Sequence, residues 1–199
     1  MVKTKDPLGE WEKPVLVKAG KGMIDPTPLW DEDGRCYLVN GWANSRIGFN
    51  GVLTVRELSA DGTRAIGEPC IVFDGDATGN VTTEGPKFYK RDGWYWILCP
   101  AGGVAGGWQL AMRSKSPYGP YEWKRVLERG KTTMNGPHQG GWIHTKNMVK
   151  TGLYIFRIKV LMAACVIYNL SIGVVDGLLW GMLVSLTGNS VSRNQIVRL

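Results

Sequence analysis

Asp25–Val39 reads DPTPLWDEDGRCYLV, and Glu84–Leu98 reads EGPKFYKRDGWYWIL. Aligned without a gap, the two stretches share a proline-containing entry, an aromatic residue, an Asp-Gly turn and an apolar strand. A second pair, Met1–Glu12 and Ala111–Glu122, aligns in the same way. Repeats of about 50 to 60 residues, each holding four short strands, are typical of the blades of a β-propeller.

Short apolar runs separated by turn signals fill the chain around these repeats. In the first repeat they predict four strands, over 25–30, 35–42, 51–58 and 70–75, and a further apolar run lies at 14–17. A third blade is expected to begin at NGPHQGGW, residues 135–142. No segment has helical periodicity over a helix's length, so we expect an all-β fold, a β-propeller present as an incomplete set of blades.

Propeller geometry predicts which residues meet. If the first strand of each blade starts near the central axis on one face, its Asp-Gly hairpin lies on the opposite face. Asp25, Glu84 and His138 are then expected to converge near the axis. The loops around 42–50 and 101–108 should lie on the same face.

Asp25 and Glu84 are candidates for acid and base chemistry. Each carboxylate stands beside proline and apolar residues at a strand entry, where partial loss of water raises a carboxyl pKa. Hydrolysis of a glycosidic bond uses such a pair, an acid for the leaving oxygen and a second carboxylate. The alternative is that both carboxylates cap backbone N–H groups in the entry loops.

Tryptophans offer candidate sugar contacts. Trp42 and Trp108 belong to the loops of the expected active face and could stack on sugar rings, whereas the alternative is packing within the β core. The tryptophans within expected strands are assigned to the core: Trp30, Trp94, Trp96 and Trp123.

Charge and cysteine usage exclude several classes. The 199 residues carry a formal net charge of +7, but the basic residues are scattered among acidic ones, so nucleic-acid binding is not expected. The four cysteines form no CxxC pair and read as small buried hydrophobes. The N-terminal residues lack the apolar stretch of a signal peptide. Nothing in the residues indicates an oligomeric state.

Together these motifs resemble the family 43 glycoside hydrolases, a family of five-bladed propellers that includes β-xylosidases and α-L-arabinofuranosidases. The resemblance covers residues 1–147 and also rests on PAGGVAGGWQLAMRS and SPYGPYEW. It implies an inverting hydrolase of xylosyl or arabinofuranosyl linkages in plant poly- or oligosaccharides. It implies no required cofactor, and a periplasmic or extracellular location.

The resemblance also implies roles for three residues. The Glu of the EGP motif, Glu84, would be the general acid, and the Asp of the IDP motif, Asp25, would orient that acid and tune its pKa. The histidine of the HQGG segment, His138, would lie near the central channel, where it could contact substrate or, indirectly, a structural calcium ion or water. The family's general base is an Asp of the first blade, and no residue of this sequence matches it.

The sequence changes character near residue 147. Residues 151–199 carry four of the 24 Lys and Arg and one of the 17 Asp and Glu, and the apolar runs at 160–175 and 177–186 are interrupted by Asp176. We expect residues 1–147 to be a partial propeller and 148–199 an aberrant apolar tail. Our hypothesis is a reading-frame slip, because another frame over 157–170 can encode the family's DKGAYGR and HLQP. A membrane anchor within 153–187 is the alternative, although the uninterrupted run is short of about 18 residues.

These expectations define the function to be tested. Without the base, the 199 residues are expected to have little turnover as a glycosidase. The alternatives are a non-catalytic sugar-binding propeller fragment and a membrane-anchored protein. Because a propeller leaves no edge only when its ring is closed, an open set of blades is also expected to be poorly soluble.

Overall fold

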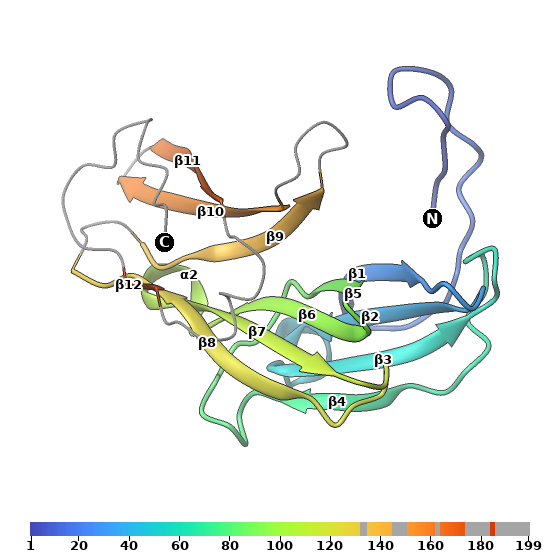
Figure 1. Ribbon diagram of the computed structural model, residues 1–199, viewed down its shortest axis with the longest axis horizontal. Coiled ribbons are helices and arrows are strands. Elements are labelled where there is room, and N and C mark those ends of the chain that lie inside the picture. Colours follow the sequence, from blue (N-terminus) through green and yellow to red (C-terminus); the bar gives the residue numbers. More distant parts are fainter. Residues whose placement is uncertain (132–134, 145–150, 162–163, 174–183, 186–199) are drawn as a thin grey trace.

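The computed structural model describes residues 1–131, 135–144, 151–161, 164–173 and 184–185 (Figure 1). Strands are the main regular structure of the described part of the chain, which also has two single-turn helices. The elements, in chain order, are β1 (Met23–Trp30), β2 (Cys36–Trp42), α1 (Asn44–Ile47), β3 (Val52–Leu58), β4 (Cys70–Asp74), β5 (Lys87–Arg91), β6 (Trp94–Ala101), α2 (Gly103–Gly106), β7 (Trp108–Ser114), β8 (Glu122–Glu128), β9 (His138–His144), β10 (Thr151–Leu161), β11 (Ala164–Gly173) and β12 (Val184–Ser185).

The first blade is an antiparallel sheet with the strand order β1-β2-β3-β4. All four of its strands lie where the sequence predicts them. The hairpin between β1 and β2 closes through the Asp31 N–H, which donates to the Arg35 carbonyl at 2.8 Å, and Gly34 adopts the positive φ of 83° that this turn requires.

The second blade repeats this arrangement with β5-β6-β7-β8, and β12 adds two residues parallel to β8. The third sheet has the order β11-β10-β9 and begins at His138, so the expected strand at HQGGW is confirmed. β1 contacts β5, and β9 contacts β6 and β7, which brings the first strand of each sheet against its neighbour. Figure 1 shows the three sheets succeeding one another in chain order.

The register of the inner strands corrects the gapless alignment by one residue. Thr27 pairs with Val39, whereas Lys87, 60 positions after Thr27, pairs with Leu98, 59 positions after Val39. The second hairpin is therefore one residue shorter than the first. A residue with positive φ lies near the start of each inner strand, and these residues are Asp25, Gly85 and Gln139. With the one-residue shift, Asp25 corresponds to Gly85 rather than to Glu84.

The main core lies between the first two blades. Buried side chains from both sheets form one continuous cluster, with Val39, Leu53 and Val55 from the first blade and Ile97 and Leu110 from the second all fully buried. A smaller cluster of Cys36, Leu38 and Leu58 lies apart from it, with Val17 and Ala65 packed against it. Cys36 and Cys99 are buried, as expected, but Cys70 is exposed, which corrects the assignment of every cysteine to the interior.

Residues 1–22 form no strand, although the apolar run at 14–17 is similar to the strand segments that follow it. Met1 and Val15 instead bond each other in both directions, at 2.6 and 2.8 Å, and the Glu12 N–H donates to the Lys3 carbonyl at 2.8 Å. The segment thus satisfies its backbone groups as a loop of its own. In Figure 1 this loop extends away from β1.

The apolar tail contains two long strands. β10 and β11 pair antiparallel from Gly152 opposite Gly173 to Leu161 opposite Ala164. The rest of the expected tail, at 148–150, 162–163, 174–183 and 186–199, lies outside the described residues. Within the ranges that are described, no helix is both long and apolar enough to cross a membrane.

Candidate active site

Asp25 and Glu84 come together at the entries of the first two blades, as predicted. Asp25 has a φ of 51°, and the register of β1 against β2 shifts between Ile24 and Thr27. This irregularity turns the Asp25 carboxylate toward the second blade, where its Oδ2 accepts the Gly85 N–H at 3.0 Å. The neighbouring Thr27 hydroxyl donates to the Pro86 carbonyl at 2.6 Å.

Glu84 is the half-buried carboxyl group of this pair. Its N–H donates to the Pro100 carbonyl at 3.3 Å, which holds its backbone against the end of β6. Burial raises the pKa of Glu84, and the negative charge of Asp25 raises it further. A carboxyl group that stays protonated to a higher pH is suited to donate a proton to a leaving oxygen.

The capping interpretation describes one of the two carboxylates. Asp25 bonds a backbone N–H of the next blade, so it caps an entry loop while also acting electrostatically on Glu84. The two interpretations of Asp25 are therefore compatible in this geometry.

Gln139 and Lys87 add polar contacts at this site, and sequence reasoning missed both. The Lys87 ammonium donates to the Gly85 carbonyl at 3.1 Å and to Gln139 Oε1 at 3.0 Å. Gln139 has a φ of 61°, like the other entry residues. The repeat with the correct one-residue shift would have placed Gln139 at the site.

Trp42 lies on the same face, at the end of β2. Its indole Nε1 donates to the Thr54 hydroxyl at 3.2 Å, and that hydroxyl donates to the buried Asn40 Oδ1 at 3.1 Å. The Trp42 ring packs against Phe49, which is 46% exposed, with ring centroids 5.8 Å apart. This aromatic pair is anchored at its polar edge and partly open to solvent, a suitable arrangement for a sugar contact.

Trp108 is held in the scaffold on several sides. Its Nε1 donates to Asn80 Oδ1 at 2.9 Å, and the Arg125 guanidinium lies 3.7 Å from the centroid of the indole. Gly102 leaves room for the ring, because a Cβ there would be 2.5 Å from it. These contacts favour a packing role and leave less of the ring for stacking on a sugar.

His138 starts β9, where its backbone pairs with Phe156. The His138 side chain lies outside the described part of the structure, so its role as a substrate or indirect calcium contact stays a prediction. Calcium takes six to eight oxygen ligands. Among the residues whose side chains are described, no three His, Cys, Asp or Glu gather to hold a metal, and the Gly85 and Gln139 oxygens accept hydrogen bonds from Lys87.

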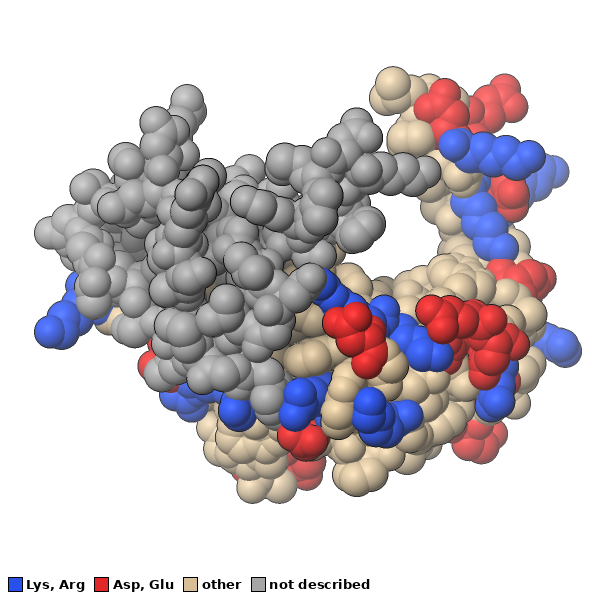
Figure 2. Space-filling view, in the orientation of Figure 1, with Lys and Arg blue, Asp and Glu red and all other residues tan. Residues whose placement is uncertain are grey.

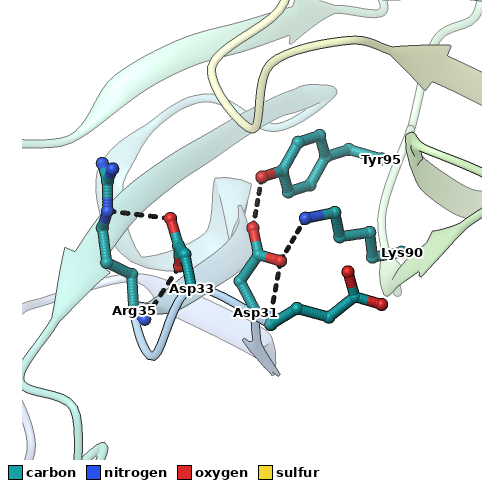
Figure 3. Close-up of polar contacts among 6 residues, drawn as sticks. Asp31, Asp33, Arg35, Lys90 and Tyr95 are labelled. Atoms are coloured by element: carbon teal, nitrogen blue, oxygen red, sulfur yellow. Dashed lines mark hydrogen bonds and ion pairs between the residues drawn. The ribbon is translucent and has the colours of Figure 1, made fainter.

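A second polar cluster lies at the hairpins, between the first two blades (Figure 3). The buried Asp31 carboxylate accepts hydrogen bonds from the Lys90 ammonium and the Tyr95 hydroxyl, and its Oδ1 also accepts the Glu32 N–H at 2.6 Å. Burial alone would raise the pKa of Asp31, but these hydrogen bonds outweigh it and lower the pKa. The cluster joins the hairpin of one blade to two strands of the next.

Acidic and basic side chains alternate over the described surface that Figure 2 shows. No extended field of one sign lies on the described part of that face. This distribution matches the scattered charges of the sequence.

Comparison with known proteins identifies the family. The sequence model described as glycosyl hydrolases family 43 matches residues 1–156. The chain belongs to glycosyl hydrolase family 43. The family 43 match extends past residue 147, where the sequence indicates a boundary, and takes in part of β10.

Relatives of the family 43 chain carry pentosidase names. It is 42% identical over 143 residues to a protein of Xylanibacter ruminicola named as a candidate β-xylosidase, a match covering 72% of this chain and 26% of that protein. It is 34% identical to a xylan 1,3-β-xylosidase of a Vibrio species, over 57% of this chain and 21% of the relative. The chain thus spans about a quarter of the length of these relatives.

Solved structures show the fold of the family 43 chain. A xylan β-1,4-xylosidase from Bacillus halodurans superposes with a TM-score of 0.72 at 24% identity, over 86% of this chain and 34% of that one. A thermostable family 43 glycoside hydrolase superposes with a TM-score of 0.66 at 19% identity, over 83% of this chain and 64% of that one. The fold is the five-bladed β-propeller of this family, and the described residues form two four-stranded blades and part of a third.

Proposed function

We propose that this chain carries the acid half of a family 43 active site that hydrolyses xylosyl or arabinofuranosyl linkages with inversion. Glu84 donates a proton to the leaving oxygen, and Asp25 keeps that proton in place by its negative charge. Water attacks the anomeric carbon from the opposite face in a single displacement. The substrates are pentose-containing oligo- or polysaccharides.

The observation that carries the proposal is the contact between Asp25 and the Gly85 peptide. It places one carboxylate beside Glu84, whose pKa is raised by burial and by that charge. Unequal environments of two carboxyl groups allow the one with the raised pKa to act as the acid. The names of the relatives support pentoses as the sugars.

The residue that activates water is the part of the reaction this site does not supply. No residue of the sequence matches the family's base, and the site residues described above are an acid, its neighbouring carboxylate and a bound lysine. We therefore expect very slow hydrolysis by these 199 residues, because losing one member of a catalytic unit costs several orders of magnitude in rate.

An external nucleophile tests the acid half directly. Azide needs no base, so incubation of the chain with xylobiose and azide is expected to form a xylosyl azide of inverted configuration, detected by proton NMR. Xylobiose has a poor leaving group, so the reaction should disappear in Glu84→Gln. It should persist in Glu32→Gln, which changes an exposed carboxylate at the first hairpin.

The same assay separates the alternatives. Calorimetric binding of xylobiose with no azide-dependent product would overturn the hydrolase proposal and favour a non-catalytic sugar-binding role. Formation of product in Glu84→Gln at the native rate would remove Glu84 as the acid.

A further inference from the structure

Lys87 lies where three sheets meet. It is the first residue of β5, and its ammonium bonds the Gly85 carbonyl of its own blade and the Gln139 amide oxygen of β9. The side chain is half-buried. Burial lowers the pKa of Lys87, while the negative charge of Asp25 on β1 acts to raise it. The ammonium is therefore linked by contact or by charge to all three sheets.

The Gly85 peptide is held at both ends. Its N–H donates to Asp25 Oδ2 at 3.0 Å, and its carbonyl accepts the Lys87 ammonium at 3.1 Å. Gly85 also has a φ of 57°, and a Cβ there would lie 2.1 Å from Gln139 Nε2. No side chain other than hydrogen fits this position without displacing Gln139.

These contacts fix the backbone next to Glu84. Glu84 immediately precedes Gly85, so any rotation of the Gly85 peptide moves the Glu84 carboxyl relative to Asp25. The groups that act on the Lys87 charge are Asp25 from β1 and Cys99 from β6, and Gln139 faces it from β9. We name Asp25, Gly85, Lys87 and Gln139 the Gly85 junction.

We propose that Lys87 is a positioning residue for the Asp25–Glu84 pair, because its ammonium clamps the Gly85 carbonyl to β9 and so keeps the Gly85 N–H on the Asp25 carboxylate. Lys87 acts through the Gly85 peptide and need not touch the substrate. This inference rests on the proposed function for its meaning, since it names what holds the acid in place. The clamp itself is a structural statement that can be measured without turnover.

Amide NMR of the 199-residue chain tests the clamp. In the native chain the Gly85 amide proton, which is hydrogen-bonded to a carboxylate, should resonate downfield. In Lys87→Met this downfield shift should shrink, and Gly85 amide exchange should accelerate about fivefold to tenfold, the effect of weakening one hydrogen bond. Lys87→Arg keeps the charge and should restore part of both signals. The amide of Ile97, in the shared core, serves as the reference for global opening.

Lys90→Met is the matched control. Lys90 lies on the same strand, but its ammonium bonds the Asp31 carboxylate at the hairpin end, so the Gly85 signals should stay native in this variant. A folded Lys87→Met chain with a native Gly85 amide exchange rate and chemical shift would overturn the inference. If Lys87→Met does not fold, Gln139→Met removes the acceptor on β9, and native Gly85 signals there would overturn it equally. If the azide assay fails while the Gly85 signals change as expected in these variants, the hydrolase proposal is wrong and the clamp still holds.

Discussion

The carboxylate of Asp31 in the first blade binds the ammonium of Lys90 in the second, and the two residues stand 59 positions apart in the chain (Figure 3). The Asp31 side chain is fully buried and that of Lys90 is 25% exposed. The Tyr95 hydroxyl donates to the same carboxylate, and burial together with this contact raises the pKa of Tyr95 to about 12. The hairpin of one blade is therefore fastened to two strands of the next.

Asp31→Asn should destabilise the fold. Removing the charge leaves the Lys90 ammonium without its partner, and we expect a loss of about 2 kcal/mol in the free energy of unfolding, below the cost of breaking a fully buried pair because Lys90 reaches solvent. Urea unfolding followed by tryptophan fluorescence measures it. Asp33→Asn is the control, since Asp33 pairs with Arg35 at an exposed site and should cost about 0.5 kcal/mol or less.

The same carboxylate makes stability depend on pH. Because the folded-state pKa of Asp31 is lowered, its contribution is complete above the unfolded pKa of about 3.9 and is lost as pH falls through the folded pKa. The unfolding midpoint of the native chain should fall below pH 4. Asp31→Asn should show a shallower decline over that range. An equal decline in both chains would mean that Asp31 gains no ionised-state stabilisation from folding.

Glu84 should titrate above an ordinary glutamate. Carbon NMR of the labelled side chain is expected to give a raised midpoint, and Asp25→Asn should lower it, since the negative charge that favours the protonated form is removed. Asp33→Asn should leave the Glu84 midpoint unchanged. An unchanged midpoint in Asp25→Asn would show that burial alone sets the pKa of Glu84.

Glu84 also has a cost in stability. A carboxyl group whose folded pKa is raised stabilises the fold fully below its unfolded pKa and loses that contribution as pH rises through the folded pKa. Glu84→Gln, which removes the charge, should therefore unfold at a higher urea concentration than the native chain at pH 7. At pH 4 the two chains should differ less. A lower midpoint for Glu84→Gln at pH 7 would contradict this reasoning.

Gly85→Ala should disrupt the Gly85 junction far more than a matched change elsewhere. The new Cβ would meet the Gln139 side chain at 2.1 Å in addition to the positive φ, and we expect a loss of about 3 kcal/mol. Gly34→Ala shares the positive φ but has open space around the new Cβ, so it should cost about 1 kcal/mol. Equal losses would mean that backbone strain alone accounts for the effect.

Trp108→Phe should leave one buried acceptor without its donor. The buried Asn80 Oδ1 loses the indole N–H at 2.9 Å, and we expect about 1 to 2 kcal/mol of destabilisation in urea. Trp30→Phe is the comparison. Trp30 is 49% exposed, which corrects its assignment to the core, and its Nε1 bonds the Ala60 carbonyl at a site where water can replace it. Similar costs for the two variants would argue against a buried role for Trp108.

Local patterns predicted the strands because each strand carries its own signals. Val52–Leu58 and Cys70–Asp74 are short apolar runs bounded by glycine and aspartate, and hairpin turns mark the first two strands of both blades. The meeting of Asp25 and Glu84 followed from the repeat, which places strand entries of neighbouring blades together. Two-residue periodicity and turn chemistry suffice to predict where the strands and hairpins lie.

The remaining features depend on contacts that no local pattern encodes. A one-residue difference between the two hairpins shifts the inner strand, and a gapless alignment cannot register it. Nothing in the sequence distinguishes Lys87 and Gln139 from other polar residues, because their hydrogen bond forms only when the third sheet packs against the second. The run at 14–17 forms no strand, because the pair of bonds between Val15 and Met1 is not continued into a ladder.

The core shared by the first two blades limits how such a protein can be recombined. Val39 and Val55 of one sheet belong to the same buried cluster as Ile97 and Leu110 of the next, so the boundary between the repeats in sequence divides a single packed interior. A blade exchanged with that of a relative would bring half of a foreign interface with it. Successful chimeras should therefore join inside a blade and move facing strands together.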